Sequence, residues 1–192
     1  MTQVEANEPD RKARVKKTDW LSAALDVLGD QGVEAVRVER LASRLGVAKS
    51  GFYYHFKDRD DLCDALIQHW KTFDGAPAAL QRGVEAQDPE KSLLTTVEMV
   101  EKFELWRLDF AIRQWAQSDP KVERVYRSEM AGRVRHITRL FSMLGFEGDE
   151  LSMRASTFVA YTTTERQLFP DMTAKERKRL WTHRIRMLAR RD

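Results

Sequence analysis

Residues 41–62 read LASRLGVAKSGFYYHFKDRDDL, and the pattern of this stretch decides the fold. Apolar residues recur three and four positions apart on both sides of Gly46, which is the spacing of one helix face. Glycine is the residue most often found just after a helix ends. The pattern therefore predicts two short helices joined by a tight turn, whose inward-facing residues are Val38, Leu41, Ala42, Leu45, Val47, Phe52 and Phe56.

The outer side of the second helix carries small, hydroxylated, imidazole or cationic residues, namely Lys49, Ser50, Gly51, Tyr53, Tyr54, His55 and Lys57. Between residues 37 and 59, six basic residues stand against two acidic ones, a net charge of +4. A helix-turn-helix with such a surface can enter the DNA major groove and attract phosphates. On pattern alone, an ordinary helical hairpin with aromatic packing stays open as the alternative.

The rest of the chain also shows helical periodicity, interrupted by residues that cap or break helices. The expected N-caps are Thr18, Asp58, Asp88, Asp119 and Thr173. The helix after Asp88 is expected to run through Val100 and onward, and the segment 75–87 is expected to be a break or loop. Because no run alternates apolar with polar residues and no repeat is found, the sequence predicts an all-α protein with about nine helices.

The composition excludes several classes of protein. The 192 residues carry 33 Lys and Arg against 30 Asp and Glu, and 42% are hydrophobic, enough for a core. No apolar run approaches the roughly 18 residues that cross a bilayer, and the first ten residues lack a signal peptide's apolar core. The single cysteine, Cys63, is expected to be a buried thiol and can form neither an internal disulfide nor a structural zinc site. We therefore expect a cytoplasmic protein that holds no metal.

The charge is distributed unevenly along the chain. Residues 1–57 carry +2, residues 58–169 carry −4 and residues 170–192 carry +5, so two basic ends enclose an acidic middle. Near the front, five cations fall within seven residues: Arg11, Lys12, Arg14, Lys16 and Lys17. Beside a DNA-reading element such an arm would add sequence-independent attraction to phosphates, and otherwise it is a solvated terminus.

The residues that usually carry catalysis are not grouped. The four histidines lie far apart, none stands in an HExxH or Glu-x-x-His arrangement, and neither a P-loop nor a GxGxxG motif occurs. The sequence thus offers no catalytic residue and no cofactor site, and we do not expect an enzyme.

The run from Leu41 to Leu62 resembles the N-terminal signature of the tetracycline-repressor (TetR) family of transcriptional regulators. The matching features are a Leu-Ala pair, a Gly-Val turn at residues 46–47, the aromatic run at residues 52–56, a basic residue three beyond Phe56, and Leu62. The resemblance covers residues 14–70. One departure is that Val36 and Arg37 stand where the family often has a small hydroxyl residue opening the second helix.

The resemblance implies a division into three parts. Residues 1–13 would be a disordered polar arm and residues 14–60 a three-helix DNA-binding domain with the helix-turn-helix. Residues 61–192 would form a helical bundle that binds an effector and dimerises.

Carried over position by position, the resemblance also implies roles in DNA binding. Ala48, Lys49, Ser50 and Gly51 would lie over base edges, with Lys49 best suited to donate to guanine O6 or N7. Tyr53, His55 and Lys57 would hold phosphates, and Tyr54 could do either. Further contacts to the DNA backbone are expected from Arg37, Ser43, Arg44 and Arg59.

The bundle would enclose an effector pocket, although the same residues could form plain core. The candidates are Met99, Phe103, Trp106, Phe110, Trp115, Tyr126, Met130, Phe158, Tyr161 and Thr162. Such a lining suits a hydrophobic or aromatic small molecule. Buried Arg113, Arg127 or His136 could instead select an acid.

The last two helices would pair with their copies in a homodimer. The candidates are Leu151, Ala155, Phe158, Val159, Leu180, Trp181, Arg184, Ile185 and Leu188. The function that follows from the resemblance is a ligand-responsive transcriptional regulator, a repressor that binds a palindromic operator as a dimer and is released by a small molecule. The alternative is an α-helical adaptor that binds protein and not DNA.

Overall fold

The computed structural model describes residues 15–72 and 88–190. The predicted arm at residues 1–13, the cations Arg11, Lys12 and Arg14, and the predicted break at residues 75–87 lie outside these ranges. Within them the chain has nine α-helices, one short 3₁₀ turn and no strand, so the all-α prediction is confirmed. The elements are α1 (Lys17–Gln31), η1 (Val33–Ala35), α2 (Val38–Leu45), α3 (Ser50–Tyr53), α4 (Arg59–Lys71), α6 (Pro89–Lys102), α7 (Leu105–Ala116), α8 (Pro120–Met143), α9 (Gly148–Leu168) and α10 (Ala174–Ala189).

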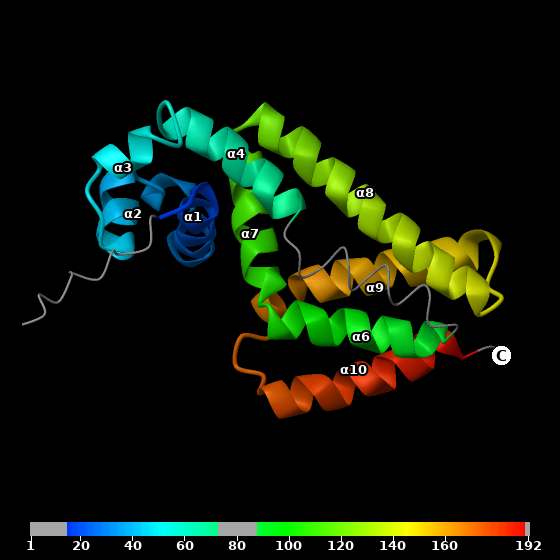
Figure 1. Cartoon of the computed structure of the whole chain (residues 1–192). Helices are drawn as coiled ribbons and strands as arrows, with labels where there is room; N and C mark the ends of the chain where they lie inside the picture. The colour runs from blue at the N-terminus through cyan, green and yellow to red at the C-terminus, as the bar shows by residue number, and fades with distance from the viewer. Residues whose placement is uncertain (1–14, 73–87, 191–192) are drawn as a thin grey trace, which may run out of the picture.

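The helices form two groups at opposite ends of the molecule (Figure 1). Helices α1, α2 and α3 make up one end, which we call the head, and α6, α9 and α10 lie at the other. Helices α4, α7 and α8 run between the two ends. Helix α7 packs on α1 as well as on α6, α8 and α9, so it joins the head directly to the bundle.

Most of the predicted helix starts are confirmed by their capping hydrogen bonds. The side chain of Asp58 accepts from the backbone N–H of Asp61 at 2.9 Å, and that of Asp88 accepts from Lys91 at 3.0 Å. Thr173 and Glu176 satisfy each other's backbone donors, as a capping box requires.

One predicted helix start is wrong. Helix α1 begins at Lys17, so Thr18 lies inside it, and the carboxylate that caps this end is that of Asp19, which accepts from the Lys16 N–H at 2.7 Å. The helix after Asp88 runs past Val100, as predicted, and ends at Lys102. Glu104, which adopts a left-handed conformation with φ at 49°, separates α6 from α7.

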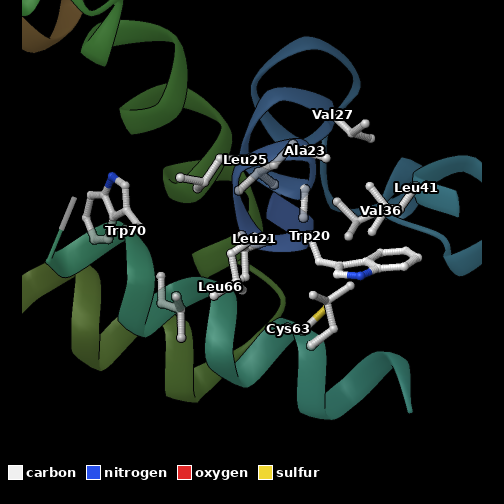
Figure 2. Close-up of a cluster of buried hydrophobic side chains, with 14 of the residues drawn as sticks. Trp20, Leu21, Ala23, Leu25, Val27, Val36, Leu41, Cys63, Leu66 and Trp70 are labelled. Atoms are coloured by element: carbon white, nitrogen blue, oxygen red, sulfur yellow. The ribbon is translucent and has the colours of Figure 1, made fainter. Parts of the chain in front are cut away.

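One hydrophobic core holds the head against α4 and α7. Trp20 is fully buried at its centre, and α4 contributes Leu62, Leu66 and Trp70 to the same cluster. Figure 2 shows the side chains of α1 lying between those of α2 and those of α4. The core therefore continues across the predicted domain boundary at residues 60 and 61. Cys63 is buried in it, as predicted, and this burial raises the pKa of its thiol.

A second core joins α6, α8, α9 and α10. Its largest side chains are Phe141, Phe158 and Trp181, which meet edge to face. Beside them, the buried carboxylate of Glu165 accepts from Trp181 Nε1 at 2.8 Å and pairs with Arg177 at 2.9 Å. Because a buried charge is costly unless it is paired, this network ties α10 to α9 in one arrangement.

Candidate nucleic-acid interface and bundle cavity

The turn between α2 and α3 sets the position of the outward-facing residues. Gly46 ends α2 in the left-handed conformation, with φ at 66°, and the Val47 N–H donates to the Ala42 carbonyl at 3.0 Å. A side chain at this φ would be strained, so glycine fits the turn. After the turn, the chain continues into α3 along the edge of the head (Figure 1).

The buried side of α3 is fixed by aromatic packing. Phe52 has no exposed surface, meets Trp20 edge to face at 5.5 Å between ring centroids, and lies 5.2 Å from Phe56. With this face anchored, Tyr53 and Tyr54 point outward and are 63% and 67% exposed. The outward side of this segment therefore presents two tyrosine rings to solvent.

Most of the other predicted DNA contacts also lie exposed on the head. They are Arg37, Ser43, Arg44, Ala48, Lys49, Ser50 and Lys57. Helix α3 is only four residues long, so the residues predicted to lie over base edges, 48–51, come from its first turn and the turn before it. Small side chains at positions 48 and 50 let the backbone approach another surface closely.

Two of the exposed cations are paired within the head. Lys49 Nζ donates to Glu39 Oε1 at 2.9 Å, and this hydrogen bond lowers the pKa of the Glu39 carboxyl. Arg44 pairs with Asp26 at 2.9 Å. Exposed ion pairs of this kind contribute little to stability and are screened by salt. A phosphate or base acceptor can therefore replace either carboxylate.

Three predicted contacts are engaged inside the head. The ring Nε2 of His55 lies 3.0 Å from the Val15 carbonyl, so it must carry its proton there as a donor. Arg59 donates to the carbonyls of Val36 at 2.8 Å and Val33 at 2.7 Å, which closes the η1 turn. Gly51 is half-buried, and a Cβ at this position would lie 3.7 Å from the Trp20 ring. The structure gives these residues roles in building the head.

The bundle contains a small cavity of about 40 Å³ between α6, α7, α8 and α9. Of the predicted effector residues, Met99, Phe158 and Thr162 line it. Eight further residues that line the cavity were not predicted from the sequence, namely Thr96, Val100, Leu105, Asp109, Arg133, Ile137, Val159 and Thr163. His136, named only as a residue that could select an acid, also lines the cavity.

The other predicted effector residues lie elsewhere. Phe103 and Phe110 are 38% and 44% exposed, and Trp115 is buried in the core of the head. Tyr126 stacks on Trp70 with centroids 6.4 Å apart. The remaining three, Trp106, Met130 and Tyr161, do not line the cavity. The aromatic composition indicated which helices form the bundle, but it did not indicate which face of each helix points inward. Arg113 and Arg127 are exposed, so the suggestion that they select an acid in a buried pocket is wrong.

An ion pair forms part of the cavity wall. Asp109, only 3% exposed, accepts from both terminal nitrogens of Arg133, one of them at 2.9 Å. The Arg133 guanidinium also lies over the Trp70 ring of α4, 5.9 Å from its centroid. Arg133 thus contacts α7, α4 and the cavity from its place on α8.

His136 stands one helical turn from Arg133 on the same face of α8. Its Nε2 atom is buried and has no hydrogen-bond partner. Burial, together with the nearby charge of Arg139, lowers the pKa of the imidazole, so the ring is neutral near pH 7. A buried polar atom without a partner costs free energy that a bound group could recover.

The predicted dimer residues divide into two sets. Five of them are buried in the second core of the single chain, which corrects their assignment: Ala155, Phe158, Val159, Trp181 and Ile185. Leu151, Leu180, Arg184 and Leu188 are partly exposed. Beyond its first turn, which exposes Asp149 and Glu150, the exposed residues of α9 are instead uncharged and mostly small, namely Ser152, Met153, Ser156, Thr157, Ala160, Gln167 and Leu168.

Comparison with known proteins identifies the head. The family profile described as "Bacterial regulatory proteins, tetR family" matches residues 21–66, which run from α1 into α4. The class C tetracycline repressor protein of Escherichia coli is 41% identical over 61 residues, 32% of this chain and 28% of the repressor. The class A repressor from transposon 1721 is 42% identical over 48 residues, 25% of this chain and 22% of that protein. Residues 21–66 are therefore similar to TetR-family regulatory proteins.

The likeness to TetR-family proteins extends through the bundle in fold alone. A transcriptional regulator from Rhodococcus sp. Rha1 superposes with a TM-score of 0.71 at 17% identity, over 91% of this chain and 94% of that one. The regulator FadR from Bacillus subtilis, solved in complex with stearoyl-CoA, gives a TM-score of 0.63 at 16% identity, over 91% and 98%. In sequence, the chain matches about a quarter of the length of the two tetracycline repressors. The matched profile describes regulatory proteins. No helix within the described residues is long and apolar enough to span a membrane.

Proposed function

We propose that this protein is a ligand-responsive transcriptional repressor of the TetR family that binds a palindromic operator as a homodimer. The observation that carries the proposal is the surface of the head at residues 43–57. There the buried Phe52 fixes α3, while hydroxyl and cationic side chains stand exposed around it. Such a surface positions a protein on phosphates and brings a few side chains to base edges.

The DNA contacts that we propose follow from exposure. Lys49 reads a base edge, and its ammonium exchanges Glu39 for the new acceptor. Phosphates are held by hydroxyl and cationic groups from Arg37, Ser43, Arg44, Ser50, Tyr53, Tyr54 and Lys57. His55, Arg59 and Gly51 support this surface from behind, because their own contacts lie within the head. The domains that we propose keep residues 14–60 as the DNA-binding unit, with α4 shared between its core and the bundle.

We place the dimer contact on the exposed face of α9. Small residues such as Ser156 and Ala160 let two helix backbones approach closely. The exposed residues from Ser152 to Leu168 are uncharged, which lowers the cost of removing this part of the face from water. Met153 and Leu168 supply apolar area at its two ends. A twofold dimer would present two heads to half-sites about one helical turn, or roughly 34 Å, apart.

The cavity is where we propose that an effector acts. Two contacts connect the helices that line the cavity to the head and to the core that holds it. Arg133 contacts Trp70 of α4, and Leu108 and Arg107 of α7 lie close against Gly29 of α1, where Arg107 also pairs with Asp30. A ligand that binds one arrangement of α7 and α8 more tightly would shift the population of head positions and release the DNA. The complex of FadR with stearoyl-CoA supports the view that this fold binds small molecules.

The test is a binding experiment on the full-length chain. Duplexes retained from a random library at low salt are sequenced, and the enriched site is titrated by fluorescence anisotropy. We expect a palindromic site. We expect the affinity of the protein for this site to fall in the Tyr53→Phe and Lys57→Ala variants but not in Lys175→Ala, which changes an exposed lysine on α10. Absence of any retained DNA at low salt would overturn the proposal and favour the protein-binding adaptor.

A further inference from the structure

The charges on the cavity wall neutralise each other. The buried carboxylate of Asp109 is bound at both oxygens by Arg133, so neither group has charge left unpaired on the cavity side. The three threonine hydroxyls of the wall donate to carbonyls of their own helices, Thr96 to Ser92, Thr162 to Phe158 and Thr163 to Val159. An ionic ligand would therefore lose its hydration without gaining an opposite charge, which disfavours it.

A single polar atom of the wall lacks a partner. Among the side-chain nitrogen and oxygen atoms that line the cavity within the described chain, His136 Nε2 is the one that is buried and makes no hydrogen bond. A neutral imidazole carries its proton on either nitrogen, so Nε2 is a donor in one tautomer and an acceptor in the other. A hydroxyl group can both donate and accept, and it therefore suits either tautomer.

The remaining surface of the wall is apolar and the space is small. Met99, Val100, Leu105, Ile137, Phe158 and Val159 supply the apolar lining. The cavity of about 40 Å³ is far below the roughly 300 Å³ or more of a site for a drug-sized ligand. A ligand must therefore move helices apart as it enters, and a compact molecule needs the least movement.

We infer that the effector is a compact, uncharged, mostly apolar molecule with one hydroxyl group, which hydrogen-bonds to His136 Nε2 in the cavity between α6, α7, α8 and α9. Phenols and short-chain or cyclic alcohols belong to this class. The inference rests on the proposed function only in calling the ligand an effector. The binding chemistry follows from the wall itself.

The test uses three probes that share one ring and differ in one substituent. Phenol, toluene and benzoate are titrated against the full-length protein by ligand-observed NMR at probe concentrations up to the millimolar range. We expect phenol to bind about five- to tenfold more tightly than toluene, the usual contribution of one hydrogen bond, and benzoate to bind most weakly. Equal binding of phenol and toluene, or no binding of any probe, overturns the inference. So does tightest binding of benzoate, which marks an anion site at Arg133.

Variants of the histidine separate its role from a general effect on packing. His136→Leu removes the polar atom, and we expect it to make phenol and toluene bind equally. His136→Gln places an amide nitrogen near the position of Nε2, and we expect it to restore the preference for phenol. Thr96→Val is the matched control, since it changes another polar residue of the same wall and is expected to keep that preference. Loss of the preference in Thr96→Val with retention in His136→Leu contradicts the assignment of the anchor.

A parallel measurement distinguishes this inference from the proposed function. The enriched DNA duplex is bound to the protein, and each probe is added while the anisotropy is followed. If phenol binds through His136 but leaves the DNA bound, the ligand chemistry holds and the proposed release mechanism fails. If the protein binds no DNA at all, the repressor proposal fails while the NMR result decides the ligand class.

Discussion

Lys49 is the residue whose proposed role separates base reading from simple attraction to phosphates. In the free protein its ammonium is held by Glu39 at 2.9 Å on the exposed surface, so it is already positioned beside α3. We expect Lys49→Ala to weaken binding to the enriched operator by about 1–3 kcal/mol and to relax the preference at one base pair. Titrations against operators mutated at each position measure this. Uniform weakening across all positions would place Lys49 on a phosphate instead.

His136 predicts a dependence of stability on pH. Burial lowers the pKa of its imidazole in the folded state, whereas the unfolded chain takes up a proton near pH 6.5. The unfolded state therefore binds more protons below about pH 6.5, and the free energy of unfolding falls as the pH drops. This contribution is at most about 1.4 kcal/mol per pH unit.

The variant His136→Gln has no such proton and should lose less stability than the parent between about pH 7.5 and about pH 5.5. Asp109 of α7 and Arg133 and Arg139 of α8 are the charged groups around the ring, and they stay in both proteins. Urea unfolding followed by circular dichroism at the two pH values measures the difference. Parallel pH profiles for the two proteins would show that His136 titrates alike in the folded and unfolded chains.

At the level of elements, the contact between α1 and α7 depends on Gly29. A Cβ at this position would meet Arg107 Nε at 3.0 Å and Leu108 Cδ2 at 3.3 Å. We expect Gly29→Val to force these side chains away and to destabilise the protein by about 1–3 kcal/mol. For a chain of this size, this corresponds to a fall of roughly 2–12 °C in Tm.

The matched control is Gly132→Ala on α8, where the nearest neighbour of a new Cβ is the end of the Arg135 side chain at 3.7 Å. Removing a helix-interior glycine there should stabilise by roughly 0.5–1 kcal/mol. Differential scanning calorimetry of both variants measures the pair. An unchanged Tm in Gly29→Val would mean that α1 and α7 are not closely packed.

The elements also show which parts of the fold could be predicted from sequence. Asp88 and Asp119, each followed by proline, mark helix starts through local hydrogen bonds and a fixed φ, so the sequence carries the signal. The break at Glu104 has no such signal, because the residue in the left-handed conformation is not a glycine or an asparagine, which would have marked it.

The candidate sites follow the same division. The exposed surface at residues 43–57 could be predicted, since its apolar and polar positions alternate with the helix period and its motif matches a family. The cavity could not, because Asp109 and Arg133 lie 24 residues apart on different helices and become partners only in the folded bundle. Most of the aromatic residues that suggested a pocket make other contacts instead. Trp115, for example, is buried in the core of the head.

For the whole molecule, the exposed and uncharged part of α9 from Ser152 to Leu168 predicts how the protein assembles. Ala160 lies near the middle of this face and is exposed in the single chain. We expect Ala160→Glu to convert a dimer into a monomer, because a twofold contact would bury two like charges against each other. Sedimentation equilibrium at micromolar concentration measures the mass. Arg124→Glu, an exposed change on α8, is the control and should stay dimeric. A dimeric Ala160→Glu variant would move the interface away from α9.

Assembly and DNA binding are connected through the dependence of affinity on salt. Each head offers about three cations for phosphates, Arg37, Arg44 and Lys57, so a dimer would neutralise about six. The plot of log affinity against log salt should then have a slope of about −5. A monomeric Ala160→Glu variant engages one head, and its slope should be about half as steep. Anisotropy titrations of both proteins on the same duplex measure the two slopes. If the slopes are equal, each DNA site is bound by one head and the proposed twofold complex is wrong, whatever the mass of the free protein.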